Sequence, residues 1–343
     1  MKPVIFGLSG TTLTDGEMRL FSEHQPAGYI LFKRNCVDKA QVKALTDALK
    51  KIAGTEKTLI LIDQEGGRVT RLMPPEWRKP PAAKLFADLY LQAPEKARAL
   101  TYLNARLIAA ELREVGITGN CAPLADIPAP GSHDIIGDRA FGRTPEQVTD
   151  LAGIQARGLM EGGIIPVLKH IPGHGRATAD SHERLPTVET PANVLKQSDF
   201  VPFQRLANLP YGMTAHIRYT AIDADQPATL SPKVIRMIRD DLGFHGILMT
   251  DDLSMKALSG DLGMLAKQSL AAGCDLILHC NGEFSEMKSI ADALGPIAPP
   301  IQVAMSMGWA RLATGLPDAA TEFADLSNKY NDMAGSLDAA AVA

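Results

Sequence analysis

The sequence has few cysteines and no long apolar run. Its 343 residues include only four cysteines (Cys36, Cys121, Cys274 and Cys280), and they form neither a CxxC pair nor a zinc-ligand spacing. We therefore expect reduced, structural cysteines and no disulfide framework. The longest wholly apolar runs are as short as a strand, whereas a membrane-spanning helix needs about 18 or more such residues. The sequence predicts no contact with a membrane.

An excess of basic charge is also lacking. Lysine and arginine number 35 against 39 aspartates and glutamates, which gives a formal net charge of −4 and a pI of about 6.1. Such a chain has no basic surface on average to neutralise a run of phosphates, so nucleic acid is not an expected partner. The apolar stretch 4–8 is too short for a secretory signal and is not followed by a small-residue cleavage site. We therefore expect a cytoplasmic protein.

Short apolar runs rich in strand-forming residues recur along most of the chain. They cover residues 4–8, 28–32, 59–63, 117–123, 164–170, 211–216, 246–251 and 276–280. Most are separated by stretches in which apolar residues return every three or four positions, as in a helix. Eight alternating units, with no GxGxxG after the first strand, favour a closed (β/α)8 barrel of the TIM type over an open doubly wound sheet. The predicted class is therefore α/β.

Helix boundaries carry local signals. A hydroxyl residue before a proline predicts helix starts at Thr144, Thr190 and Ser231, and Gln147 would complete a capping box at the first of them. Glycines before the next strand predict left-handed helix ends at Gly116, Gly162 and Gly243. An apolar stripe over residues 323–333 predicts that the chain ends in extra helices packed on the barrel. We expect one domain over residues 1–334, with a frayed tail over 335–343.

Ionisable residues close four of the predicted strands. They are Asp63, Lys169, His170, His216 and Asp251. In a barrel of this kind the carboxyl ends of the strands meet on one face, so these side chains are predicted to converge on a pocket. Each residue taken alone is equally compatible with a solvated strand end, and Asp252 is compatible with a helix cap.

The segment 171–189 is long and without regular periodicity, which is typical of a functional loop. Pro172 and two glycines exclude a helix there, so His170 and His174 are not a helical pair of zinc ligands, and no metal is predicted. Asp180 and His182 are two residues apart and face the same side of an extended segment. A carboxylate beside an imidazole raises the ring's pKa and fixes its tautomer, as suits a general acid. A surface pair without a role is the alternative.

Four motifs together resemble a known family. They are DQEGGRV at 63–69 with Arg71, KHIPGHG at 169–175, DSH at 180–182 and TDDLSM at 250–255. This pattern resembles the single-domain β-N-acetylhexosaminidases of glycoside hydrolase family 3, and the resemblance covers nearly the whole chain. Ile171 stands where the family usually has phenylalanine, Thr250 replaces a serine, and residues 137–141 read GDRAF with Asp and Ala where Glu and Ser are common. None of these departures removes a reacting group.

The resemblance implies a retaining exo-hydrolase that removes terminal N-acetylglucosamine from anhydro-muramic acid or muropeptide fragments during peptidoglycan recycling, without a cofactor. It implies Asp251 as the nucleophile, His182 as the acid/base and Asp180 as its partner. It implies sugar contacts from Asp63, Arg71, Arg139, Lys169 and His170, while His216 inherits no role. The oligomeric state stays open, a monomer included. The alternatives are a glucosidase or xylosidase of the same family, an aldolase with a Schiff base on Lys169, and a non-catalytic sugar-binding barrel.

Overall fold

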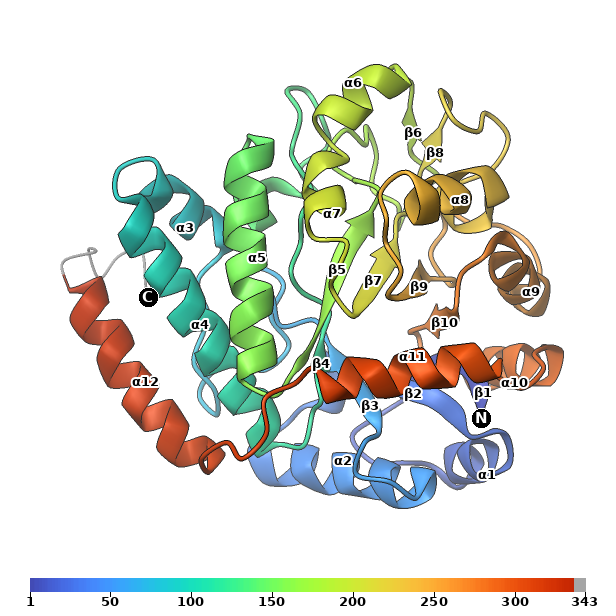
Figure 1. Ribbon diagram of the computed structural model, residues 1–343. Helices are drawn as coiled ribbons and strands as arrows, with labels where there is room; N and C mark the ends of the chain where they lie inside the picture. The colour runs from blue at the N-terminus through green and yellow to red at the C-terminus, as the bar shows by residue number, and fades with distance from the viewer. Residues whose placement is uncertain (336–343) are drawn as a thin grey trace.

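Eight parallel strands close into a barrel in the computed structural model, which describes residues 1–335 (Figure 1). The order around the barrel is β1-β10-β9-β7-β5-β4-β3-β2. The strands are β1 (Lys2–Gly7), β2 (Pro26–Leu31), β3 (Leu59–Ile62), β4 (Gly119–Asn120), β5 (Ile165–Ile171), β7 (Tyr211–Thr214), β9 (Ile247–Asp252) and β10 (Leu276–His279). The predicted (β/α)8 fold is confirmed. Most of the predicted tail, residues 336–343, lies outside the described residues.

Helices surround the barrel, and a small parallel sheet lies outside it. The helices are α1 (Asp15–His24), α2 (Lys39–Ala53), α3 (Ala83–Tyr90), α4 (Pro94–Glu114), α5 (Pro145–Glu161), α6 (Ala192–Gln197), α7 (Val201–Arg205), α8 (Pro232–Asp240), α9 (Leu262–Ala272), α10 (Phe284–Ala293), α11 (Pro299–Ala310) and α12 (Ala319–Ala334). The outer sheet pairs β6 (Thr187–Val188) with β8 (Arg218–Tyr219). No helix within residues 1–335 has the length and apolar character needed to cross a membrane.

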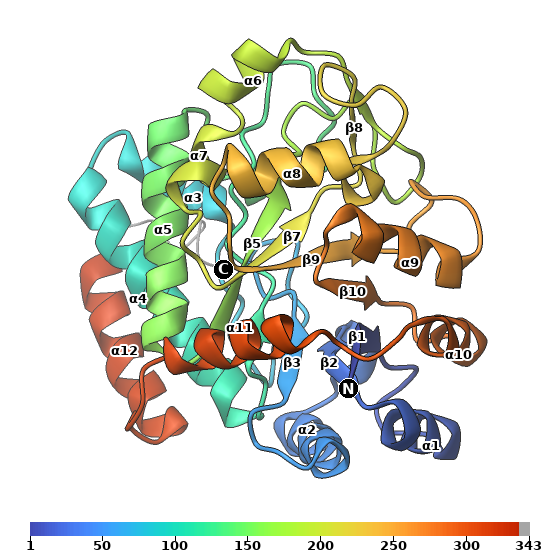
Figure 2. The same cartoon turned by 45° about the vertical axis from the view of Figure 1, so that its right-hand side comes forward.

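The inside of the barrel is filled by apolar side chains, and α11 covers one of its ends. Strand residues such as Ile5, Leu61 and Val167 form the interior cluster, which Met305 of α11 joins. Figure 2 shows α11 lying across the amino-terminal ends of the strands. Burying an apolar side chain of this size contributes about 1.5–3 kcal/mol. The amino-terminal end is therefore closed by packing, and the polar residues gather at the opposite end.

The extra helix at the end of the chain packs on α4 (Figure 1). Leu326 and Tyr330 of α12 are buried, whereas Met333 at the end of the predicted stripe is exposed. Glu322 forms ion pairs with Arg106 and Arg113 of α4. The predicted C-terminal helices are thus present, and the last one is held by both apolar contacts and charge.

The local helix signals were partly wrong. Thr144 and Ser231 do cap α5 and α8, since each side chain accepts a main-chain N–H. Gln147, however, donates to the carbonyl of Ala87 at 2.7 Å and not to the cap, so the capping box is absent. The start of α6 also differs, because Pro191 and not Thr190 is its N-cap. The left-handed residue after α5 is Gly163, with φ of 78°, in place of Gly162.

Candidate active site

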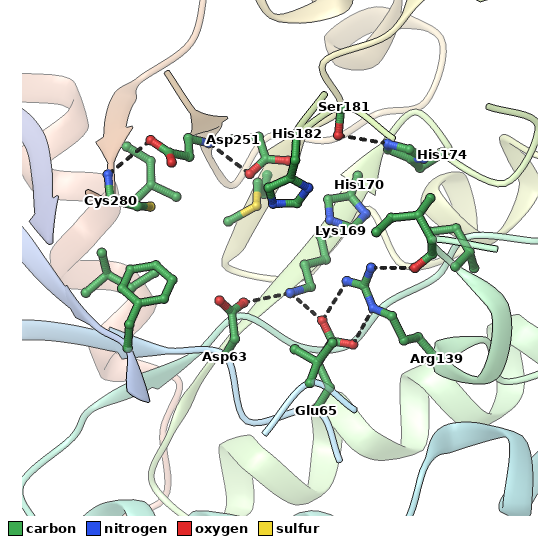
Figure 3. A pocket seen from close by; sticks show the side chains of 18 of the residues that line it. Asp63, Glu65, Arg139, Lys169, His170, His174, Ser181, His182, Asp251 and Cys280 are labelled. Carbon is green, nitrogen blue, oxygen red and sulfur yellow. Dashed lines mark hydrogen bonds and ion pairs between the residues drawn. The ribbon is translucent and has the colours of Figure 1, made fainter. Parts of the chain in front are cut away.

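The carboxyl ends of the strands surround a cavity of about 180 Å³. Figure 3 shows side chains converging on it from several strand ends and from the loop after β5. Of the predicted site residues, those that line it are Asp63, Arg71, Arg139, Lys169, His170, His182 and Asp251. These residues lie far apart in the chain, and the fold brings them to one cavity. Within residues 1–335 no group of three or more His, Cys, Asp or Glu side chains is arranged to hold a metal ion.

Lys169 lies at the centre of a buried ionic network. Its Nζ is 2.9 Å from Oδ1 of Asp63 and 2.6 Å from Oε1 of Glu65 (Figure 3). Burial opposes the charge on Lys169, but the two carboxylates outweigh burial and raise the pKa of the amine above its usual range. A Schiff base requires a neutral amine, so this environment argues against the aldolase alternative.

Asp63 is shared between two cations. Its Oδ2 lies 3.1 Å from Nη2 of Arg71, while its other oxygen, Oδ1, pairs with Lys169. Burial would raise the pKa of Asp63, yet Lys169 and Arg71 together hold it well below its usual value. The side chain is therefore an acceptor for the hydroxyl groups of a ligand.

Glu65 is a site residue to which sequence reasoning gave no role. Both of its oxygens accept hydrogen bonds of 2.8 Å from Arg139, in a bidentate pair. Burial is again outweighed, first by Arg139 and then by Lys169, and the pKa of Glu65 falls to about 2. One signal could have found it: Glu65 follows Asp63 by two residues, which in an extended segment places both carboxylates on the same side.

Asp126 is the second residue without a predicted role. It is fully buried, and its Oδ2 lies 2.7 Å from Nδ1 of His170. Its Oδ1 accepts the main-chain N–H of His174 at 2.6 Å. The sequence holds no signal for this contact, because Asp126 is 44 residues away from His170 and lies outside any regular element.

The structure brings the two loop residues together. Oδ1 of Asp180 lies 2.8 Å from Nδ1 of His182 and also accepts the main-chain N–H of His182 at 2.8 Å. Burial acts to raise the pKa of Asp180, but these hydrogen bonds lower it below its usual value. The side chain of His182 is 67% exposed while lining the cavity, so it is accessible to a ligand.

Asp251 and Asp252 adjoin each other at the end of β9 but differ in their contacts. Both residues line the cavity, and Oδ1 of Asp251 accepts the N–H of Asp252 at 2.8 Å. Burial would raise the pKa of Asp251, but His170 and the hydrogen bond from the N–H of Asp252 outweigh burial and lower it, so Asp251 is ionised. Asp252 accepts from the main-chain N–H groups of Ser254 and Cys280, each at 3.0 Å. It stabilises the turn after β9 and caps no helix.

His216 does not converge on the cavity as expected. Its ring is buried, with Nδ1 2.7 Å from Oγ1 of Thr229 and Nε2 3.0 Å from the carbonyl oxygen of Asp252. Burial lowers the pKa of His216, which keeps the ring neutral. The residue therefore supports the strand end that carries Asp251 and is not among the residues that line the cavity.

Residues 9–302 match the sequence model of the family described as Glycosyl hydrolase family 3 N terminal domain. The chain belongs to glycoside hydrolase family 3. The resemblance seen in the sequence is thereby confirmed, as is the assignment to glycoside hydrolases. A protein named beta-hexosaminidase from Alkalilimnicola ehrlichii is 40% identical over 284 residues, covering 81% of this chain and 80% of its own. Another of that name from Thioalkalivibrio sulfidiphilus is 39% identical over 310 residues, covering 88% and 87%.

Solved structures of the family have the same fold. NagZ from Neisseria gonorrhoeae, in complex with N-trifluoroacetyl-D-glucosamine, superposes with a TM-score of 0.86 at 28% identity, covering 97% of this chain and 98% of its own. A family 3 beta-N-acetylglucosaminidase from Paenibacillus gives a TM-score of 0.82 at 32% identity, covering 96% of this chain and 67% of its own. Family 3 membership thus extends over nearly the full length of the barrel.

Proposed function

We propose that this glycoside hydrolase is a retaining exo-β-N-acetylglucosaminidase that removes terminal N-acetylglucosamine from muropeptide fragments in the cytoplasm. One observation carries the proposal: the ionised Asp251 and His182 line the same cavity, and Asp180, which does not line it, holds the ring of His182 from behind. The curated relatives named beta-hexosaminidase support it. So does the neighbouring NagZ structure, which holds an N-acylated glucosamine.

In the first step Asp251 attacks the anomeric carbon of the sugar, and the bond to the leaving oxygen breaks. His182 gives its proton to that oxygen, so the products are a glycosyl ester on Asp251 and a neutral alcohol. Retaining enzymes usually perform this step with two carboxyl groups about 5–5.5 Å apart. Here an imidazole held by Asp180 takes the place of the second carboxyl group.

In the second step water attacks the anomeric carbon of the ester. His182, now neutral, accepts a proton from the water, and the carboxylate of Asp251 is released. The sugar leaves with its original β configuration, and both residues return to their starting protonation states. The ionised state of Asp251 in the free protein is the one that the first step needs.

Charged groups around the cavity suit a polar sugar ring. The carboxylate of Asp63 can accept from sugar hydroxyls, while Lys169 and Arg71 can donate to sugar oxygens. We assign Arg139 and His170 to the same set of sugar contacts. All five residues line the cavity.

The histidine also bears on the leaving group. After it donates its proton, an imidazole is neutral, whereas a carboxylic acid becomes an anion. A neutral group repels an anionic leaving group less, and muramic acid carries a carboxylate. This favours muropeptide fragments as the substrate, and their recycling as the role of the enzyme.

A comparison of chromogenic substrates tests the proposal. The purified protein is assayed with 4-nitrophenyl N-acetyl-β-glucosaminide, β-glucoside and β-xyloside, and the first product anomer is identified by NMR. We expect cleavage of the N-acetylglucosaminide with the β anomer appearing first. Faster cleavage of the glucoside or xyloside would assign the chain to another β-glycosidase, and a first α anomer would exclude the two-step mechanism.

A further inference from the structure

We propose that Asp126 is a positioning residue of the sugar site, whose carboxylate binds the Nδ1–H of His170 and so leaves Nε2 as the ring nitrogen that meets the substrate. The inference rests on the proposed function only in taking His170 as a sugar contact. His170 lines the cavity, whereas Asp126 lies behind it and is fully buried. Asp126 therefore acts through His170 and touches no substrate itself.

Both oxygens of Asp126 are engaged, each by a different part of the chain. Oδ2 lies 2.7 Å from Nδ1 of His170, and Oδ1 accepts the main-chain N–H of His174 at 2.6 Å. The main-chain N–H of His170 lies 3.3 Å from both oxygens. Burial would raise the pKa of Asp126, but the hydrogen bonds from the ring of His170 and from the main-chain N–H of His174 outweigh burial and lower the pKa, so the group is an anion.

This arrangement determines where the ring proton is. An ionised carboxylate has only acceptors, so the ring nitrogen 2.7 Å from Oδ2 must carry a proton. Within residues 1–335 the hydrogen bonds of His170 to other side chains involve its Nδ1 and its main-chain N–H, and none involves Nε2. A single buried anion thus decides which nitrogen of His170 is available to a sugar hydroxyl.

Asp126 is also connected to the loop that carries Asp180 and His182, through His174. Nε2 of His174 lies 3.3 Å from Oγ of Ser181, the residue between Asp180 and His182. The rings of His170 and His174 are also in edge contact, with centroids 5.4 Å apart. Asp126 therefore fixes the sugar-binding end of β5 and the start of the loop in one geometry.

The variant Asp126→Asn tests the proton position directly. The main-chain N–H of His174 cannot change, so the amide oxygen of the asparagine must face it. The amide NH₂ then faces Nδ1 of His170, which must become an acceptor, and the ring proton moves to Nε2. We expect ¹⁵N NMR of histidine-labelled protein to show a protonated Nδ1 in the wild type and a protonated Nε2 in the variant. The signal is assigned by its loss in His170→Gln. A wild-type ring without a proton on Nδ1, or a variant ring that keeps it, overturns the proposal.

A double-mutant cycle tests the functional consequence. The cycle compares Asp126→Asn, His170→Gln and the double variant on 4-nitrophenyl N-acetyl-β-glucosaminide. Losing a charge-assisted hydrogen bond predicts that kcat/KM falls about 10-fold to 100-fold in Asp126→Asn. Because Asp126 acts through His170, the double variant should fall within about twofold of His170→Gln alone. Losses that multiply would mean that Asp126 acts independently of the histidine.

Asp223→Asn is the matched control. Asp223 is also a buried carboxylate that accepts from a side chain, Oγ of Ser231 at 2.6 Å, and from a main-chain N–H, that of Asp225 at 3.1 Å, but it does not line the cavity. The Asp223→Asn variant should have a lower melting temperature than the wild type and an unchanged kcat/KM. If Asp126→Asn behaves in the same way, its role is only structural and the proposal is wrong. A wild type that cleaves no N-acetylglucosaminide would refute the proposed function and leave the NMR result to stand by itself.

Discussion

Asp251 and Asp252 are adjacent at the end of β9, and their different hydrogen bonds suit them to different roles. Asp252 is saturated by hydrogen bonds that hold the following turn, including one from Oγ of Ser254 at 2.7 Å. Both residues line the cavity, but among residues 1–335 Asp251 accepts a single hydrogen bond, from its neighbour's N–H. A nucleophile needs a free oxygen, so the contacts favour Asp251.

Asp251→Ala should therefore abolish turnover while leaving the fold intact, because a carboxylate at the cavity contributes little to the core. The measurement is the steady-state rate on an activated aryl N-acetylglucosaminide, with circular dichroism and the melting temperature recorded alongside. Asp252→Ala is the control and should show the opposite balance, with a lower melting temperature. A near-native rate for Asp251→Ala would transfer the role of nucleophile to Asp252.

The charge of Glu65 is expected to make the stability of the folded protein depend on pH. Its pKa in the folded protein is about 2, below the value of about 4.3 for an exposed glutamate, so its charge stabilises the folded state. Glu65→Gln leaves the charges of Arg139 and Lys169 less compensated and should cost about 3 kcal/mol at pH 7. This difference should be constant above about pH 5 and shrink as the pH falls toward 2, because the wild-type glutamate then takes up a proton.

Urea unfolding of both proteins at a series of pH values measures this effect. Glu56→Gln serves as the control, since the side chain of Glu56 is 88% exposed and its ion pair with Lys50 spans 3.4 Å. It should change the free energy of unfolding by no more than about 0.5 kcal/mol at any pH. A pH-independent difference for Glu65→Gln would mean that packing, and not charge, accounts for its effect.

Among the elements, the strands were the most predictable. Each predicted strand range contains or overlaps a barrel strand, because apolar runs bounded by glycine and polar residues have few other uses in this pattern. The sheet of β6 and β8 was missed, since it pairs two-residue strands about thirty positions apart. Gln147 shows why caps are less predictable: its amide found the carbonyl of Ala87, on a helix that sequence spacing does not bring near.

In the candidate site, too, residues at strand ends were predictable from the sequence, and residues held by tertiary contacts were not. Asp63, Lys169 and Asp251 could be placed because each closes a strand whose carboxyl end faces the cavity. Arg139 was placed only by resemblance, since it lies in a short helical turn, Gly137–Arg139. Asp126 could not be placed at all, because its role arises from tertiary contacts with His170 and His174.

The loop between β5 and β6 holds Asp180 and His182, the proposed acid/base pair. If His182 is the general acid, His182→Ala should lose on the order of 10² to 10⁴ in rate on substrates with poor leaving groups. Aryl glycosides with good leaving groups need little protonation, so their first step should be affected much less. Asp180→Asn should show the same dependence with a smaller loss, because it loosens the ring without removing the proton carrier.

Rates plotted against leaving-group pKa for these proteins test whether His182 is the general acid. Glu183→Gln is a suitable control, because this residue is exposed on the same loop and does not line the cavity. Its line should coincide with that of the wild type. A line for His182→Ala parallel to the wild type and at similar height would reduce the loop pair to a surface feature.

At the scale of the whole molecule, α12 connects the end of the chain to the barrel unit. We propose that residues 1–334 form one domain. The helix lies on α4, far along the chain from it, and is joined to it by buried apolar contacts and by Glu322 (Figure 1). No residue of α4 or α12 lines the cavity at the carboxyl ends of the strands, so stability and activity can be separated here.

Glu322→Ala should accordingly destabilise the molecule without changing its chemistry. The side chain of Glu322 is 6% exposed, and its removal leaves the charges of Arg106 and Arg113 without their partner. Breaking such a pair costs about 3 kcal/mol, which for a chain of this size lowers the melting temperature by roughly 6 °C. Glu95→Ala is the matched control, because Glu95 also pairs with an arginine of α4 but is 89% exposed, and it should shift the melting temperature by no more than about 1 °C. Calorimetry at one scan rate should show a single transition in all three proteins, with kcat/KM at 25 °C unchanged. If Glu322→Ala instead splits the transition in two, α12 unfolds separately, and the domain ends before it.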